Sequence, residues 1–434
     1  MSLSVGIDLG TSACRVAVIN NQGKLLSLSR VSLPEPETNG PYCEQNPDDW
    51  WQACQQALNK ALVKVSRAEI SRIAVDGTSS TLLLCEANGL PQGLALMYRD
   101  QRAQQQAQRL AKLAPATAAV HSPSSSLAKL LWLNDQGQLK KGLKALHQTD
   151  WITGKLTGCY NSSDENNALK LGYDPASQSW PNWLANCGLP DDCLPTVLPA
   201  GQLLGPIAPA IAAQFGLSTD CQVVAGTTDS TASFIASGAL ATGDAVTVLG
   251  STLVIKILGD KPIYAPELGV YSHRLGNKWI IGGASNTGGA VLEQFFNSQQ
   301  LEQLSKQIDP NQPSELNYMP LPGIGERFPV NDPAKQPVLT PRPASDVDFL
   351  HGLLEAMSKI EQQGYATLVS LGAPAPSSIR TCGGGAINPT WQAIRSRLLK
   401  VPMLAAHNNE AAFGTALLAS GSSSTLQHNQ NELE

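Results

Sequence analysis

Residues 4–12 read SVGIDLGTS, an apolar stretch that ends in an aspartate, a glycine and two hydroxyl residues. It is followed by CRVAVI, a polar NNQG break and KLLSLSRVSL, which together predict three short β-strands joined by two turns. The same order returns from Asp244, where DAVTVLG precedes Ser251-Thr252 and the apolar run LVIKIL. The sequence therefore predicts an internal duplication, in which each copy places a glycine and hydroxyl residues at the tip of its first hairpin.

The chain has 434 residues, enough for two cores, because domains mostly contain about 100 to 200 residues. Amphipathic helical segments such as DDWWQACQQALNKALVKV follow the strand clusters. We therefore expect an α/β protein with two lobes and a cleft between them, an N-terminal lobe over residues 1–240 and a C-terminal lobe over 241–424. Residues 425–434 contain few apolar side chains and are expected to be disordered.

Charge and composition exclude several classes of partner. The 30 Lys and Arg against 35 Asp and Glu give a formal net charge of -5, without basic runs, so nucleic acid is not expected as a partner. No apolar run approaches the ~18 residues of a membrane span and no signal-peptide pattern is present, which predicts a cytoplasmic protein without membrane contact. The nine cysteines and six histidines are dispersed, so neither a zinc site nor a histidine-centred nucleophile is indicated.

The first turn suits the terminal phosphates of ATP. Gly10 lets backbone N–H groups approach an anion, and the hydroxyls of Thr11 and Ser12 supply further donors. Asp8, at the strand end, is a candidate for holding Mg²⁺ through water. The alternative is an ordinary hairpin in which the Asp8 side chain caps its own turn.

The second turn, Gly250, Ser251 and Thr252, repeats this pattern without the carboxylate. Such turns are common, and this one gains weight as the matching member of a duplicated pair. We expect it to bind the same phosphate chain as the first turn.

A third glycine turn lies between a predicted strand and a predicted helix and consists of Gly383, Gly384 and Gly385. Three glycines allow a flat ligand to lie against the backbone, and a helix N-terminus beside them favours an anion. Adenosine fits this description, with Asn388 as a hydrogen-bond partner and Trp391 as an apolar wall. A close helix–strand packing turn is the alternative.

Asp229 follows an apolar stretch and begins a helical run, in AGTTDS. A carboxylate that accepts the proton of a substrate hydroxyl is a recurring part of phosphoryl transfer, so Asp229 is the candidate base. The alternative is that Asp229 is simply a helix N-cap.

These motifs, taken in order, resemble the motif set of FGGY-family carbohydrate kinases. Residues 124–133, SSSLAKLLWL, also resemble the first signature of that family, and similar segments extend over nearly the whole chain. The resemblance implies a duplicated ribonuclease-H-like (actin-like ATPase) fold, with sugar bound mainly by the N-terminal lobe and ATP mainly by the C-terminal lobe. It implies that Asp229 is the catalytic base, that Asp8 is the metal-associated carboxylate, and that ATP and Mg²⁺ are the cofactors.

The resemblance also implies which residues contact the sugar. Asp76, Gly77 and Ser80 lie in one candidate loop, Asp100 lies in a second, and Ser230 follows the base. Xylulokinases typically have a histidine where this chain has Ser80, and the DGTSS loop looks more like the ribulokinase branch. We therefore expect a small-molecule ketopentose substrate, D-ribulose first and D-xylulose as the alternative. For Arg99 and Arg102 a solvated surface position is an alternative at least equal to a place in the sugar site.

Two further alternatives keep the fold without efficient sugar phosphorylation. An ATP-switched binding module would retain the phosphate turns but would need no sugar loops. A sugar-sensing pseudokinase would retain both but turn over slowly. The presence of Asp8, Asp229 and all three glycine turns favours the kinase over the pseudokinase.

Overall fold

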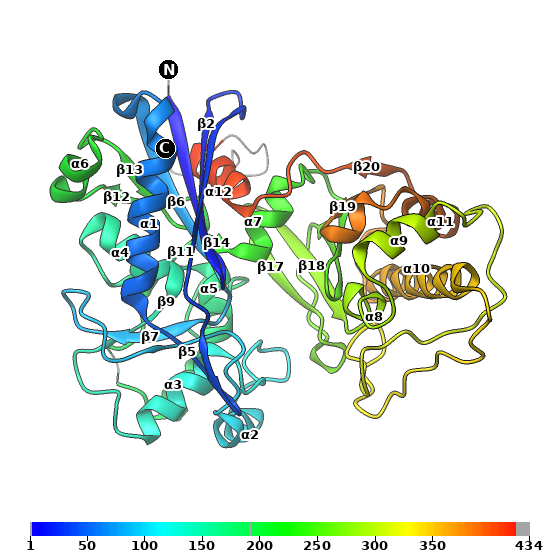
Figure 1. Cartoon of the computed structure of the whole chain (residues 1–434). Coiled ribbons are helices and arrows are strands. Elements are labelled where there is room, and N and C mark those ends of the chain that lie inside the picture. The colour runs from blue at the N-terminus through cyan, green and yellow to red at the C-terminus, as the bar shows by residue number, and fades with distance from the viewer. Residues whose placement is uncertain (1, 191, 422–434) are drawn as a thin grey trace. The chain divides into compact units, whose positions relative to one another are not determined.

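The computed structural model describes residues 2–190 and 192–421 of the chain, which form two compact units (Figure 1). The predicted division places residues 241–424 in the second lobe, whereas the described residues 410–421 belong to the first unit. The predicted disordered tail, 425–434, lies outside the described residues. Unit 1 comprises the chain up to Ala236 with residues 273–277 and the segment from Glu410, and unit 2 comprises Ser237–Ser272 and Lys278–Asn409.

The main sheet of unit 1 begins with the three predicted strands, which form an antiparallel meander. β6 then pairs with β1 in parallel, and β13 and β14 both pair with β6 in parallel. The order across the sheet is β12-β13-β6-β1-β2-β3. The strands are β1 (Leu3–Leu9), β2 (Ala13–Asn20), β3 (Leu25–Ser32), β6 (Ile70–Gly77), β12 (Leu203–Pro206), β13 (Gln222–Val224) and β14 (Thr227–Thr228).

Helices cover both faces of this sheet. α1 (Pro47–Ala61) packs Trp50, Cys54 and neighbouring apolar residues against Val5, Ile7 and other side chains of the meander. Its N-cap is Asn46, whose side chain accepts a hydrogen bond from the N–H of Asp48, and proline occupies the first turn. The predicted helix in this segment is therefore confirmed.

The opposite face of the sheet is covered by α12 (Ala411–Ser420), which approaches the backbone of β1 very closely. A Cβ added to Gly6 would lie 2.1 Å from the carbonyl oxygen of Ala412, and one added to Gly414 would lie 1.9 Å from that of Ala232, in α7 (Asp229–Ala236). Glycine at these two positions lets α12 contact the sheet and α7 backbone to backbone.

A second sheet in unit 1, ordered β4-β5-β8-β7-β9, carries the loops that follow β6. Its strands are β4 (Glu37–Asn39), β5 (Tyr42–Gln45), β7 (Leu82–Cys85), β8 (Ala95–Leu96) and β9 (Lys144–His147), and β10 (Ser162–Asp164) and β11 (Thr196–Leu198) pair separately. The remaining α-helices of unit 1 are α2 (Gln104–Leu113), α3 (Ser126–Asp135), α4 (Gln148–Thr157), α5 (Glu165–Ala168) and α6 (Pro209–Phe215).

Unit 2 repeats the strand order of unit 1. β15, β16 and β18 are antiparallel neighbours, and β19 pairs with β15 in parallel, as β6 pairs with β1. The predicted duplication is thereby confirmed. The strands of this sheet are β15 (Asp244–Leu249), β16 (Leu253–Gly259), β17 (Tyr271–Leu275), β18 (Lys278–Ser285), β19 (Ser378–Cys382) and β20 (Met403–Ala405), of which the last three residues of β17 are counted with unit 1. The α-helices of unit 2 are α8 (Gly289–Leu292), α9 (Ser298–Ser305), α10 (Asp346–Ser370) and α11 (Pro389–Leu399).

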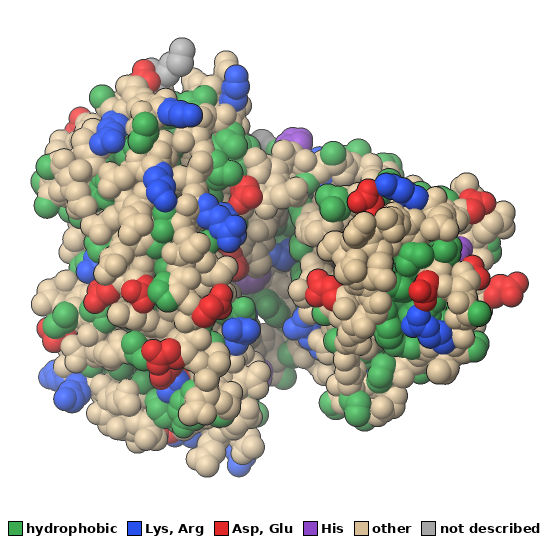
Figure 2. Space-filling view, viewed as in Figure 1, with side chains coloured by type: hydrophobic (Ala, Val, Ile, Leu, Met, Phe, Trp, Pro, Cys, Tyr) green, Lys and Arg blue, Asp and Glu red, His purple; other side chains and the backbone are tan. Residues whose placement is uncertain are grey.

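Within the described residues, no helix is both long enough and apolar enough to cross a membrane. The face drawn in Figure 2 shows Lys and Arg side chains scattered among Asp and Glu rather than gathered into one basic patch.

Candidate functional site

Three aspartates lie where adjacent parallel strands of unit 1 end. Asp8 of β1 is directly opposite Asp76 of β6 in the strand register. Thr227 of β14 is also opposite Asp76, and Asp229 follows two residues later. Ligands of parallel α/β sheets bind outside the carboxyl ends of the strands, so this edge is the candidate site of unit 1.

Asp8 is only 4% exposed, and its carboxylate accepts a hydrogen bond from the Arg15 guanidinium at 3.0 Å. Arg15 also approaches Glu410, 3.4 Å away, at the start of α12. Burial raises the pKa of Asp8, and the positive charge of Arg15 opposes that rise. Arg15, on β2, was not among the predicted site residues, although its position opposite Asp8 in the hairpin follows from the strand pattern.

Asp76 is completely buried, and its Oδ2 accepts a hydrogen bond from the hydroxyl of Thr415 in α12. Its other oxygen, Oδ1, has no hydrogen-bond partner among the described residues. Burial, and then the negative charge of Asp8, raise the pKa of Asp76 well above its usual value. Asp76 thus lies beside Asp8 in the strand register, and its contact with the sugar stays a prediction.

We expect Asp76→Asn to raise the melting temperature at about pH 8 by roughly 2 to 4 °C, with a smaller effect at about pH 5. A carboxyl whose pKa is raised by folding stabilises the protein at low pH and loses that stabilisation as the pH rises through the folded pKa. Asparagine keeps the Thr415 contact but has no such penalty. Calorimetry at both pH values tests this, with the exposed Asp220→Asn as control, and equal shifts for the two variants would contradict it.

Asp229 is the first residue of α7 and is half-buried. Its Oδ1 accepts a hydrogen bond from the N–H of Ser230 at 2.6 Å, which is a contact within the first turn of the helix. Ser230 is exposed, and its hydroxyl lies 3.4 Å from that of Thr228. Asp229 therefore lies at the start of a helix, as the N-cap alternative expects, and it also has the partial exposure that a catalytic base requires.

The first phosphate turn has the expected hairpin geometry. The N–H of Gly10 donates to the carbonyl of Ala13 at 3.1 Å, and Leu33 donates to the carbonyl of Ser12. The hydrogen bond to Ala13 uses the N–H of Gly10. The donors of this turn that remain for an anion are therefore those of Thr11, which is half-exposed, and Ser12, which is exposed.

The loop after β6 contains Gly77 and Ser80. A Cβ added to Gly77 would lie 2.9 Å from the Oε1 of Gln148 and from the Oγ1 of Thr149, so the backbone passes close to α4. Ser80 has a positive φ of 71° and a buried hydroxyl without a hydrogen-bond partner among the described residues. A strained turn with an unsatisfied hydroxyl is the kind of feature that a ligand satisfies.

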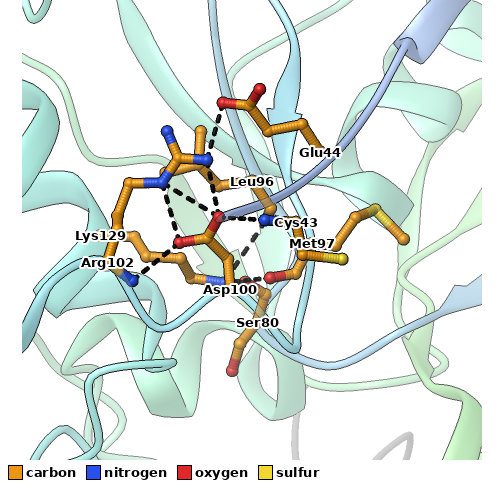
Figure 3. Close-up of polar contacts among 8 residues, drawn as sticks. All are labelled: Cys43, Glu44, Ser80, Leu96, Met97, Asp100, Arg102 and Lys129. Atoms are coloured by element: carbon orange, nitrogen blue, oxygen red, sulfur yellow. Dashed lines mark hydrogen bonds and ion pairs between the residues drawn. The ribbon is translucent and has the colours of Figure 1, made fainter. Parts of the chain in front are cut away.

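The second sugar loop contains Asp100 and Arg102. Asp100 is completely buried, and its oxygens accept hydrogen bonds from the N–H of Cys43 and from the guanidinium of Arg102 (Figure 3). Arg102, for which a solvated surface position is one alternative, has a side chain only 4% exposed, and it also pairs with Glu44 at 2.7 Å. The Asp100 carboxylate therefore accepts hydrogen bonds from protein donors and orders this loop, and its contact with the sugar stays a prediction.

The glycine turns of unit 2 lie at the ends of neighbouring parallel strands, since Val248 of β15 is opposite Cys382 of β19. The turn of Gly250, Ser251 and Thr252 is closed by a 3.2 Å hydrogen bond between the first and last of them, and it is partly exposed. Gly383 has a φ of 86°, and a Cβ there would lie 2.6 Å from the carbonyl oxygen of Leu249. The two turns are therefore in direct contact within unit 2.

Asn388 and Trp391 are used by the protein itself. The Asn388 amide caps α11 by accepting from the N–H of Trp391 at 3.0 Å, and it donates to Ser305 at 2.9 Å. Trp391 is 3% exposed and donates its indole N–H to Ser358. Both side chains thus make structural contacts, and their contacts with adenosine stay predictions. A Cβ added to Gly385 would lie 2.7 Å from the Trp391 ring, so Trp391 does line this turn, and Ile387, in the same turn, is 89% exposed.

A Ser–His–Asp alignment that the sequence analysis did not indicate lies in the interior of unit 1. The ring of His147 is 2.8 Å from the carboxylate of Asp150 and 3.0 Å from the hydroxyl of Ser126. All three side chains are buried, and Asp150 also accepts from the backbone N–H of His147 to cap α4. This alignment therefore joins α3 to the start of α4, and the burial of its three side chains indicates a structural role.

Two domain families and several known proteins match the chain. Residues 3–236 match the N-terminal domain, and residues 245–422 the C-terminal domain, of the FGGY family of carbohydrate kinases. Xylulose kinase of Escherichia coli (strain K12) is 25% identical over 407 residues, which cover 89% of this chain and 83% of that protein. Xylulose kinase of Bacillus subtilis (strain 168) is 25% identical over 443 residues, covering 96% and 88%.

The fold has solved counterparts. The crystal structure of xylulose kinase from Rhodospirillum rubrum matches with a TM-score of 0.86 at 21% sequence identity, over 96% of this chain and 89% of that chain. Such structures have the actin-like ATPase fold, so the predicted fold class is confirmed.

Proposed function

The chain belongs to the FGGY family of carbohydrate kinases, and from that premise we propose that it transfers the γ-phosphate of ATP to a hydroxyl of a ketopentose. The observation that carries the proposal is the convergence of Asp8, Asp76 and Asp229 at the ends of three adjacent parallel strands. Phosphoryl transfer commonly uses one carboxylate that helps to hold the metal ion and another that accepts the hydroxyl proton. The aspartates at this sheet edge are candidates for both roles.

In the proposed reaction Asp229 accepts the proton of the sugar hydroxyl as the hydroxyl oxygen bonds to the γ-phosphorus. The bond from that phosphorus to the oxygen bridging to the β-phosphate breaks, and ADP leaves with the electron pair. Ser80 and Ser230 supply hydroxyls to the sugar, and Gly77 lets the backbone of that loop approach it. Thr11 and Ser12 donate to the phosphate chain.

Asp8 and Asp76 fit a magnesium ion. The described residues contain no cluster of three or more His, Cys, Asp or Glu side chains placed to hold a metal by themselves. Mg²⁺ is commonly held by one or two carboxylates together with waters and substrate phosphates, and the unpartnered Oδ1 of Asp76 beside Asp8 suits that mode. When bound there, Mg²⁺ would neutralise charge on the phosphates.

Unit 2 supplies its own candidate contacts for a nucleotide. We assign the phosphates to the turn of Gly250, Ser251 and Thr252, and the adenosine to the backbone of the Gly383 turn. Ile387 would supply the apolar surface for the base in place of Trp391, because the Ile387 side chain is exposed and Trp391 is buried.

Two sugars remain in competition, because the DGTSS loop favours D-ribulose whereas relatives named xylulose kinase favour D-xylulose. We expect D-ribulose to have the higher kcat/KM, by about tenfold, since a pocket that hydrogen-bonds a hydroxyl discriminates against a mispaired one by 1–3 kcal/mol or more. A coupled ADP assay with both sugars tests this, and a higher kcat/KM for D-xylulose would reverse the assignment.

The same assay tests the function itself. An ATP-switched module would hydrolyse ATP at a rate independent of D-ribulose, D-xylulose and other ketoses. A sugar-sensing pseudokinase would gain thermal stability with a sugar but would form no sugar-dependent ADP. Either result would overturn the kinase proposal.

A further inference from the structure

Lys129 is a fully buried lysine in α3, within the segment SSSLAKLLWL, and the reaction described above does not use it. Its Nζ donates to the carbonyl oxygens of Ser80 at 2.5 Å, Met97 at 3.0 Å and Leu96 at 3.4 Å (Figure 3). An ammonium has three N–H donors, so each of the three finds a backbone acceptor. A buried charge that is paired only with peptide carbonyls is costly and therefore calls for an explanation.

The three acceptors belong to two separate segments. Ser80 lies in the turn after β6, whereas Leu96 and Met97 lie in and just after β8. The segments are also joined by a hydrogen bond of 3.1 Å from the N–H of Tyr98 to the Oγ1 of Thr81. The ammonium thus sits at the point where the two loops predicted for sugar recognition meet.

The hydrogen bond from Lys129 Nζ to the carbonyl of Ser80 is the shortest of the three, and Ser80 has a positive φ. Such a backbone conformation in a non-glycine residue persists only when its surroundings hold it. By fixing the carbonyl of Ser80, Lys129 also fixes the direction of the Ser80 side chain, whose hydroxyl has no partner in the part of the chain that the structure describes.

We propose that Lys129 is a positioning residue for the sugar, an ammonium that ties the Ser80 turn to the segment at Leu96 and Met97 and so places the Ser80 hydroxyl. The expected effect on the KM for the sugar rests on the proposed function. The expected effect on the order of the two loops rests on the contacts alone.

Charged groups around Lys129 come from several elements. Burial lowers the pKa of Lys129 to about 7, which the carboxylate of Asp100 opposes and the positive charges of Lys170 and Arg102 reinforce. Cys43 also faces it, but burial raises the pKa of that thiol, which stays neutral through the same range. The ammonium is therefore charged on the acid side of neutrality and loses one donor on the alkaline side.

Lys129→Met removes the donors at nearly constant shape, and Lys144→Met is the matched control. Lys144, on β9 of the same unit, also donates its Nζ to a backbone carbonyl, that of Asp192, which is a residue of neither sugar loop. At about pH 6 we expect Lys129→Met to raise the KM for D-ribulose at least about tenfold, with the KM for ATP unchanged within about twofold. The difference from wild type should shrink at about pH 8, because the wild-type amine is then mostly neutral.

Hydrogen exchange separates failure of this proposal from failure of the proposed function. In Lys129→Met, peptides covering residues 78–81 and 95–98 are expected to exchange about tenfold faster than in wild type and in Lys144→Met, whether or not the sugar is turned over. Unchanged exchange in both loops would overturn the proposal. So would a sugar KM in Lys129→Met equal to that of an active wild type. Lack of sugar-dependent ADP formation by wild type would instead count against the kinase.

Discussion

Asp229→Asn is expected to lower kcat for sugar-dependent ADP formation by about a hundredfold to ten-thousandfold, the range that general-base catalysis contributes. Asparagine keeps the size of the side chain and can still accept the hydrogen bond from the N–H of Ser230. It cannot take a proton, so α7 should form normally while the transfer step slows. The loss should fall on kcat, with the KM values for sugar and ATP changed little.

A role limited to capping α7 predicts the opposite pattern for Asp229. Asparagine is as good an N-cap as aspartate, so a capping residue would tolerate the substitution with kcat nearly unchanged. Asp220→Asn, an exposed aspartate of the same unit, serves as the control for loss of one negative charge. If Asp229→Asn retains wild-type kcat, Asp229 is not the base.

Gly414→Val is expected to destabilise the protein by about 3 kcal/mol or more and to lower the melting temperature by about 6 °C or more. A Cβ at this position would lie 1.9 Å from the carbonyl oxygen of Ala232 and 2.8 Å from the backbone nitrogen of Ala236. Both are backbone atoms of α7, so no side-chain rotation can relieve the contact. The helices must separate, and α7 is the helix that Asp229 begins.

Gly323→Val is the matched control for this substitution. A Cβ at Gly323 would meet no atom within 4 Å, so the same change in bulk should leave the melting temperature nearly unchanged. Calorimetry of both variants measures the difference, and equal melting temperatures for the two would show that α12 does not depend on backbone contact.

Most of the fold was predictable because its signals are local. The hairpin pattern around Asp8, repeated after Asp244, indicated two meanders, and period-3.6 apolar residues indicated α1. In parallel strands the ends coincide, so the grouping of Asp8 with Asp229 followed from topology once the fold class was known. The sheet against which α12 packs was not predictable in this way. The α12 sequence is apolar on all sides, so it does not indicate which sheet the helix covers.

The roles of several side chains could not be predicted because their partners are remote in sequence. Asp100 accepts a hydrogen bond from the N–H of Cys43, 57 residues earlier, in addition to those from Arg102, and Asn388 donates to Ser305, 83 residues earlier. Lys129 reaches Ser80 over 49 residues. A motif shows that a polar residue stands near a loop, but whether its hydrogen-bonding capacity remains available is decided by tertiary contacts that spacing does not encode.

The placement of α12 on the sheet of unit 1 has a consequence for biosynthesis. A ribosome delivers β1 and β6 first, then all of unit 2, and only afterwards the helix that covers Gly6 and supplies Thr415 to Asp76. Domains generally fold as they emerge from the ribosome. The face of this sheet that α12 covers nevertheless stays uncovered after Ala236 has been translated, until the residues up to Asn409 have followed. The nascent chain therefore carries an exposed apolar surface through that interval, which is where a chaperone would act.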